Sequence, residues 1–195
     1  MKQERARVTR QRVIDVAFAL WADRGYDQVS VDTICEQAGI AKGTFYFYFP
    51  TKEHLLVRIM PSGSDAVHEA AAPLLDRGAP SEEIFESMAV VIARRLQRYP
   101  QPLVARAALE TLHLAGHPLV VEGSSRFRML AQRIFAAAHE RGEIDPSYSA
   151  SELAAIMNWT FLQAVIHWAE RGLPHTQLAP LLLHRARLVL RGSSR

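Results

Sequence analysis

Residues 31–48 contain two helical segments that are each too short to be stable alone. Ser30 is a good N-cap for the first segment, and Gly39 ends that segment after roughly two turns. The second segment runs from about Lys42 to Tyr48. Because isolated helices of two turns are marginal in water, the two segments must pack against each other and against a longer helix.

A longer amphipathic helix precedes these two segments. Thr9 is a suitable N-cap for it, and Gly25 supplies the left-handed residue that ends a helix. Its inner face is formed by apolar residues at helical spacing, namely Val13, Ile14, Ala17, Leu20 and Trp21. Two short helices joined at Gly39-Ile40-Ala41 and packed on this helix form a helix-turn-helix, whose second short helix enters the major groove of DNA.

The rest of the chain also has helical periodicity, with few alternating β-branched runs and no Asn-Gly or Asp-Gly hairpin turn. Thr51 caps a fourth helix that carries Leu55 and Leu56 and that Pro61 should break. Further helices are expected at about 64–77, 81–99, 102–115, 118–141, 149–171 and 177–191, and the start at 149 is a capping box. The fold class is therefore all-α, with a three-helix DNA-binding domain at 1–60 and a larger helical domain at 61–195.

The residues of the second short helix suit contact with DNA. Lys42 is a donor to phosphate or guanine, Gly43 lets the backbone approach closely, and Thr44 offers a hydroxyl and a methyl group. Tyr46 and Tyr48 present phenolic donors. The three phenylalanines of this region cannot all face DNA productively, so we expect them in the core: Phe45, Phe47 and Phe49.

An ordered set of residues between Arg12 and Leu55 is similar to the N-terminal pattern of the TetR family of transcriptional regulators. The set comprises Ile14, Ala17, Leu20, Trp21, Gly25-Tyr26, Ser30-Val31, Ile34, Ala38-Gly39-Ile40, Lys42-Gly43-Thr44-Phe45-Tyr46, Phe49, Lys52-Glu53 and Leu55-Leu56. The resemblance implies that Lys42, Gly43, Thr44, Tyr46 and Tyr48 belong to the recognition helix. It also implies that Ser30 caps the supporting helix beside the DNA backbone and that Lys52 reaches a phosphate.

Two positions depart from the family pattern. Ala41 stands where a small hydroxyl residue usually precedes the recognition helix, which should cost about 1 kcal/mol of capping. Pro61 should interrupt the fourth helix, which in the family links the DNA-binding and ligand-binding parts.

Positive charge is concentrated at the N-terminus, although the chain as a whole carries a net charge of only +3. The first twelve residues hold one carboxylate, Glu4, against Lys2, Arg5, Arg7, Arg10 and Arg12. Such an arm is either a tracker of DNA phosphates or an ordinary frayed terminus.

The helix at 149–171 is apolar on two faces, which predicts burial on both. One face carries Leu153, Met157, Thr160, Phe161, Ala164 and Trp168, and the other carries Ile156, Trp159, Gln163 and Ile166. The last helix also has an excess of apolar residues. By resemblance to the family, the last two helices pair with their copies in a homodimer that suits the half-sites of double-stranded operator DNA.

A pocket for an unidentified small-molecule ligand is expected among the central helices, with an apolar lining and a few polar groups. The candidate lining residues, each also a possible core residue, are Phe85, Met88, Ile92, Leu109, His113, Phe127, Leu130, Trp159 and Gln163.

Other function classes have little support in the sequence. No catalytic motif is found, so an all-α enzyme is the weakest alternative, and we expect no catalytic residues, no cofactor and no metal, including at His113 and His117. Cys35 is a single cysteine expected to be a buried or semi-buried residue and not a redox switch. A charged N-terminus and the lack of long apolar runs favour a cytoplasmic protein without a membrane partner.

The leading hypothesis is a TetR-like repressor released by a ligand, and a TetR-like activator or a regulator controlled by a protein partner stays open.

Overall fold

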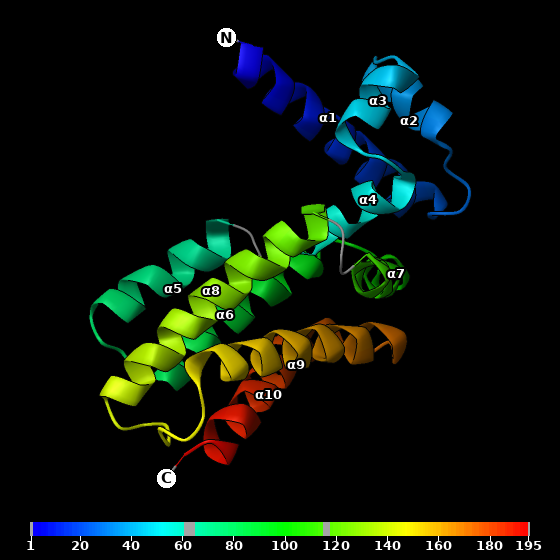
Figure 1. Ribbon diagram of the computed structural model, residues 1–195. Coiled ribbons are helices and arrows are strands. Elements are labelled where there is room, and N and C mark those ends of the chain that lie inside the picture. The colour runs from blue at the N-terminus through cyan, green and yellow to red at the C-terminus, as the bar shows by residue number, and fades with distance from the viewer. Residues whose placement is uncertain (1, 61–64, 115–117, 195) are drawn as a thin grey trace. The chain divides into compact units, whose positions relative to one another are not determined.

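The computed structural model describes residues 2–60, 65–114 and 118–194, and every regular element in these ranges is helical (Figure 1). The chain divides into two compact units, residues 1–59 and residues 60–195. Across the described ranges, no helix combines the length and the apolar character needed to span a bilayer.

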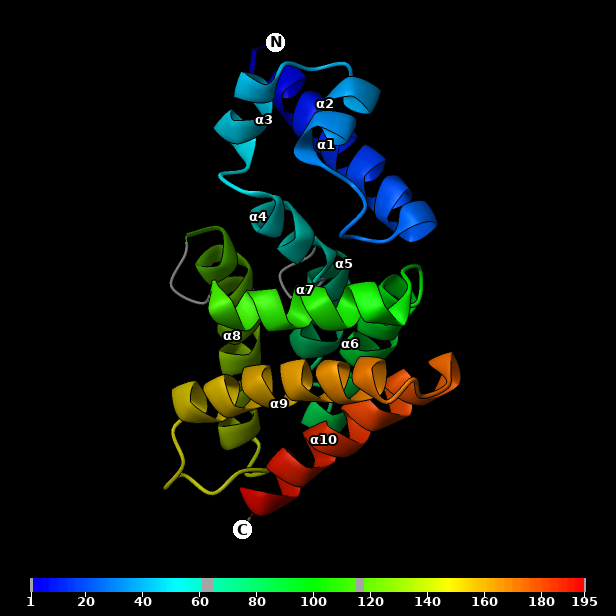
Figure 2. The same ribbon diagram turned by 90° about the vertical axis from the view of Figure 1, so that its right-hand side faces the viewer.

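The first unit contains α1 (Lys2–Arg24), α2 (Val31–Ala38), α3 (Lys42–Tyr48), α4 (Lys52–Leu56) and a 3-10 turn, η1 (Val57–Ile59). Figure 2 shows α2 and α3 beside α1. Helix α2 packs on both α1 and α3. The buried side chains of these helices include Val13, Ala17, Trp21, Ile34, Cys35, Ala38, Phe45 and Phe49. Burial raises the pKa of the Cys35 thiol, so this cysteine is a core residue with little thiolate character.

The start of α1 differs from the sequence expectation, because Thr9 lies inside a helix that begins at Lys2. The basic arm is therefore helical. Its residues are mostly good helix formers, and an ion pair between Glu4 and Arg7, three residues apart with a 2.7 Å contact, adds local support. The guanidinium of Arg10 lies 5.7 Å from the centroid of the Phe49 ring, which ties the third turn of α1 to the end of α3.

The second unit contains α5 (Asp65–Asp76), α6 (Ser81–Leu96), α7 (Gln101–His113), α8 (Pro118–Glu140), α9 (Ala150–Glu170), η2 (His175–Gln177) and α10 (Leu178–Gly192). Helix α9 packs against α7, α8 and α10, and α10 also packs against α6. The predicted capping box is confirmed, since Ser149 accepts from the Glu152 amide and the Glu152 side chain accepts from the Ser149 amide.

The fourth predicted helix ends earlier than expected. Helix α4 stops at Leu56, and η1 follows it. Pro61, predicted to break this helix, lies outside the described residues. In the second unit, the observed helix ends differ from the predicted ones by at most three residues, the largest shift being at the end of α6.

Candidate nucleic-acid interface

Helix α3 is held in place by two buried aromatic side chains. Phe45 and Phe49 are both fully buried, with ring centroids 5.8 Å apart. The helix ends where the Phe49 amide donates to the Phe45 carbonyl at 2.8 Å. At its other end, Gly39 adopts φ 61°, a left-handed conformation that turns the chain from α2 towards α3. Ala41 is the N-cap of α3 and, as predicted, gives it no side-chain hydrogen bond.

The opposite face of α3 is open to solvent. Lys42 and Gly43 are exposed, Tyr46 is 49% exposed and Phe47 is 80% exposed. Side chains three or four residues apart lie on one helix face, so these four residues form a single surface, which we call the α3 outer face. Thr44 and Tyr48 flank it and are half-buried.

The core prediction is confirmed for Phe45 and Phe49 and is wrong for Phe47. A residue two positions along an α-helix points about 200° away, so Phe47 must leave the face that Phe45 and Phe49 share. Its ring lies beside that of Tyr48, with centroids 5.1 Å apart in an edge-on arrangement. Phe47 is thus a candidate contact residue that the sequence analysis missed and that helical spacing alone would have shown.

Lys42 and Ser30 are both accessible. The Lys42 ammonium lies 2.5 Å from Asp32, and both side chains are more than half exposed. Such exposed pairs contribute little to stability, so the Lys42 ammonium is free to exchange this carboxylate for a phosphate. Ser30 caps α2, where its hydroxyl accepts from the Thr33 amide at 3.1 Å and lies 3.0 Å from the Thr33 hydroxyl.

Lys52 has a different environment from Lys42. Its ammonium donates to the carbonyl oxygens of Tyr26 and Val29, both at 3.0 Å, and lies over the Tyr26 ring. Lys52 therefore holds the start of α4 against the loop between α1 and α2. Its predicted contact with a DNA phosphate stays a prediction, because that ammonium already has two backbone acceptors.

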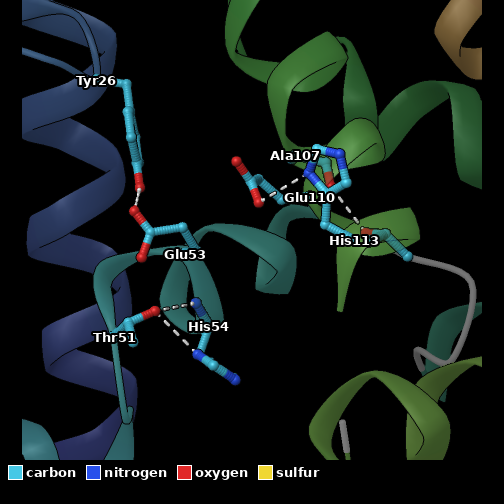
Figure 3. A network of polar contacts seen from close by, with 8 residues as sticks. Tyr26, Thr51, Glu53, His54, Ala107, Glu110 and His113 are labelled. Carbon is cyan, nitrogen blue, oxygen red and sulfur yellow. Dashed lines mark hydrogen bonds and ion pairs between the residues drawn. The ribbon is translucent and has the colours of Figure 1, made fainter. Parts of the chain in front are cut away.

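Glu53 completes this attachment, as Figure 3 shows. The Tyr26 hydroxyl donates to Glu53 at 2.9 Å, and Thr51 caps the helix beside them. Partial burial raises the pKa of Glu53. Hydrogen bonds from Thr51, the backbone and Tyr26, with the charge of Lys52, outweigh this effect and leave the pKa below its ordinary value.

The predicted DNA-binding residues come from three places in the first unit, the third being the start of α4 at Lys52. Ser30 lies at the start of α2, and the others except Lys52 lie on α3. Among the described basic residues near the start of α1, up to Arg12, three have exposed side chains: Arg5, Arg7 and Arg12. The whole set suits a polyanion, with cations and hydroxyl groups around an aromatic surface.

The predicted pocket residues separate into two groups. Five are buried in the second unit: Phe85, Met88, Ile92, Phe127 and Leu130. Four lie at the surface instead, which corrects their assignment to an internal lining: Leu109, His113, Trp159 and Gln163. Their helices present these residues away from the interior, a direction that apolar character alone does not reveal.

The interior of the second unit contains an aromatic cluster that the sequence analysis found only in part. Phe85 lies 5.4 Å from Phe135 and 6.2 Å from Phe161, and Phe161 lies 5.7 Å from Phe127, measured between ring centroids. Phe135 and Phe161 were not among the predicted lining residues. Of the two histidines at which we expected no metal, His113 lies 3.5 Å from Glu110, and His117 lies outside the described residues. Where side chains are described, no three His, Cys, Asp or Glu residues gather to hold a metal.

Comparison with known proteins matches the first unit to a bacterial family. Residues 13–59 fit the family model described as "Bacterial regulatory proteins, tetR family". The HTH-type transcriptional repressor KstR of Rhodococcus jostii is 27% identical over 95% of this chain and 84% of its own length. The fatty acid metabolism regulator protein of Bacillus subtilis is 42% identical over 30% of this chain and 29% of its own length.

A solved structure has a similar fold over nearly the whole chain. It is Thermus thermophilus FadR, a TetR family transcriptional repressor in complex with lauroyl-CoA. The TM-score is 0.75 at 23% identity, over 94% of each chain. The likeness covers both units and is a likeness of fold.

Proposed function

The chain belongs to the TetR family of bacterial regulatory proteins, and we propose that it is a transcriptional repressor that leaves its operator when a small molecule binds. The observation that carries this proposal is the α3 outer face, which is exposed and aromatic while Phe45 and Phe49 fix the helix from behind. A short helix so anchored fits the major groove as a rigid reading element. Family membership makes this regulator a DNA-binding protein and not an enzyme.

The proposed contacts divide into those that position the protein and those that read bases. Lys42 and the Ser30 hydroxyl suit phosphate oxygens, and the exposed arginines of α1 add sequence-independent attraction. Thr44, Tyr46 and Tyr48 offer hydroxyl groups to base edges or to the DNA backbone. Gly43 leaves room for close approach.

We propose a homodimer formed by α9 and α10. Helix α9 buries Met157, Phe161 and Trp168 within its own unit, whereas Ile156 and Trp159 on its other face are 50% and 54% exposed. Leu188 of α10 is 52% exposed. Apolar side chains left open on two adjacent helices suit a second copy of the same surface, and a two-fold dimer presents two α3 helices to an operator with two half-sites.

The ligand site is proposed within the second unit, near the cluster of Phe85, Phe127, Phe135 and Phe161. An aromatic interior favours a ligand with a large apolar part. The relative solved with lauroyl-CoA provides a first probe of that chemistry. The ligand lowers operator affinity only if it binds the non-DNA-binding conformation more tightly. A regulator of chromosomal operators acts in the cytoplasm, where we place this protein.

The deciding experiment compares binding to the DNA upstream of the protein's own gene with binding to scrambled DNA of equal length, across a salt titration. Tight, salt-sensitive binding that prefers the native sequence is expected. Equal, weak binding to both would contradict the proposal. Tyr46→Ala should weaken specific binding, whereas Tyr148→Ala, a tyrosine of similar exposure in the second unit, should not. Expression of a reporter gene placed behind the operator shows whether the protein represses or activates transcription. Loss of operator binding in the presence of lauroyl-CoA would identify an acyl thioester as an inducer.

A further inference from the structure

Gly43 has no reason within the folded chain to be glycine. It lies in a helix with a conformation that any residue adopts, and a Cβ built there meets no atom within 4 Å. Glycine inside a helix is about 0.5–1 kcal/mol less favourable than alanine. Gly39 differs, because its φ of 61° requires glycine. The free protein would therefore be more stable with alanine at position 43, which points to an external group that approaches this position.

Phe47 lies one helical turn after Gly43 on the α3 outer face. At 80% it is the most exposed of the large apolar residues in the described part of the chain. A phenylalanine side chain has no hydrogen-bond donor or acceptor, so its exposed ring forms no hydrogen bond with water and would form none with a polar partner. Contact between the Phe47 ring and the Tyr48 ring limits the orientations that the Phe47 side chain can adopt. Gly43 and Phe47 thus form an apolar notch beside two polar side chains, Lys42 and Tyr46.

We propose that the notch formed by Gly43 and Phe47 reads the 5-methyl group of a thymine in the operator. This inference rests on the proposed function and adds a specificity-determining pair to it. In the major groove only thymine presents an apolar group, and phenylalanine distinguishes it from the other bases by that group alone. The missing side chain at Gly43 brings the base edge within reach of the ring. Lys42, whose cation attracts the phosphates, fixes the occupant as DNA rather than an apolar protein.

Substitution of deoxyuridine for thymine tests this assignment, because it removes the methyl group and keeps the base pairing. Each thymine of an operator half-site is replaced in turn, and affinities are measured for the wild-type protein and Phe47→Ala. The wild type should lose about three- to tenfold in affinity at one symmetry-related thymine position, the size expected for one buried methyl group. Phe47→Ala should bind the thymine operator more weakly and should no longer distinguish thymine from uracil there.

Gly43→Ala gives a second, independent readout. The variant should be more stable to urea than the wild type and should bind the operator at least tenfold more weakly. Gly192→Ala is the matched control, since Gly192 is also helical, exposed and without neighbours around its Cβ position. That variant should leave operator affinity unchanged.

The outcomes separate this inference from the function on which it rests. Specific operator binding with no sensitivity to uracil at any position would overturn the thymine assignment and leave the repressor proposal intact. Full thymine discrimination in Phe47→Ala would do the same. Absence of any sequence-specific binding in the wild type would overturn the proposed function and the inference together.

Discussion

The Lys52 ammonium lies 3.9 Å from the centroid of the Tyr26 ring and donates to the carbonyl oxygens of Tyr26 and Val29. One cation thereby satisfies two backbone acceptors in the loop between α1 and α2. The loop precedes the N-cap of α2, so this attachment also fixes where α2 begins. Lys52 acts on the DNA-binding surface through this loop, whatever it contacts in the complex.

Lys52→Met keeps the aliphatic stem but removes the ammonium, which takes one donor from the Val29 carbonyl and leaves the Tyr26 carbonyl with a longer hydrogen bond of 3.4 Å from the Val29 amide. This variant should therefore destabilise the first unit by about 1–3 kcal/mol. Urea unfolding followed by circular dichroism measures the change. Lys42→Met is the matched control, since its ammonium pairs only with an exposed carboxylate. That substitution should leave the stability within about 0.5 kcal/mol and weaken DNA binding. Equal stability of the two variants would show that the Lys52 hydrogen bonds contribute nothing.

Glu53 should make the stability of the first unit depend on pH in the acid range. Its pKa in the folded protein is lower than the ordinary value of 4.5, so its contribution is fully present above pH 4.5 and is lost as pH falls through the lowered folded value. Glu53→Gln should therefore be less stable than the wild type at pH 7 and equally stable once Glu53 is protonated. Urea midpoints at a series of pH values measure this convergence. The Tyr26→Phe substitution should reduce the loss of stability that Glu53→Gln causes at pH 7. If Glu53→Gln stayed less stable than the wild type in strong acid, the ionised Glu53 carboxylate would not be the origin of that loss.

The sequence was sufficient for the helical class and for the positions of most helices, because local signals determine both. The caps Ser30 and Ser149 and the stop at Gly39 act within a few residues of themselves. The predicted N-cap at Thr9 was wrong, and local signals also explain this error. Good helix formers and the Glu4–Arg7 pair extend the helix before it, and a cap signal starts a helix only where the preceding residues do not continue it.

Side-chain directions were less predictable where the partner lies far away in the sequence. The contact of Lys52 with DNA stays a prediction, but its hydrogen bonds within the chain could not be predicted, because the two acceptors are 23 and 26 residues away. Trp159 and Gln163 lie on a helix whose two faces are both largely apolar, so periodicity gave no reason to prefer one as the interior. Phe47 is the exception, because its exposure follows from helical spacing relative to Phe45 and Phe49.

Ala41→Ser should stabilise the first unit by about 0.5–1 kcal/mol, since α3 has seven residues and no side-chain cap. The new hydroxyl would accept from an unsatisfied amide in the first turn of α3. Urea midpoints measure the gain. The control is Ala19→Ser, an exposed alanine in the middle of α1, where serine should lower stability slightly because of its poorer helix propensity. A loss of stability in Ala41→Ser would mean that its hydroxyl does not reach the first-turn amides.

Trp159→Glu should convert the proposed dimer into a monomer without unfolding it. Trp159 is more than half exposed in the single chain, so the charge costs little there, whereas burial against a second copy would desolvate it. Sedimentation velocity gives the mass, and circular dichroism checks the fold. Met129→Glu is the control, because Met129 on α8 is a large apolar residue of similar exposure outside α9 and α10, and that variant should stay dimeric. If Trp159→Glu remained a dimer while Met129→Glu dissociated, the interface would lie on α8. If the proposed surface is correct, Trp159→Glu should also bind a two-half-site operator far more weakly, since each monomer then contributes one α3 independently.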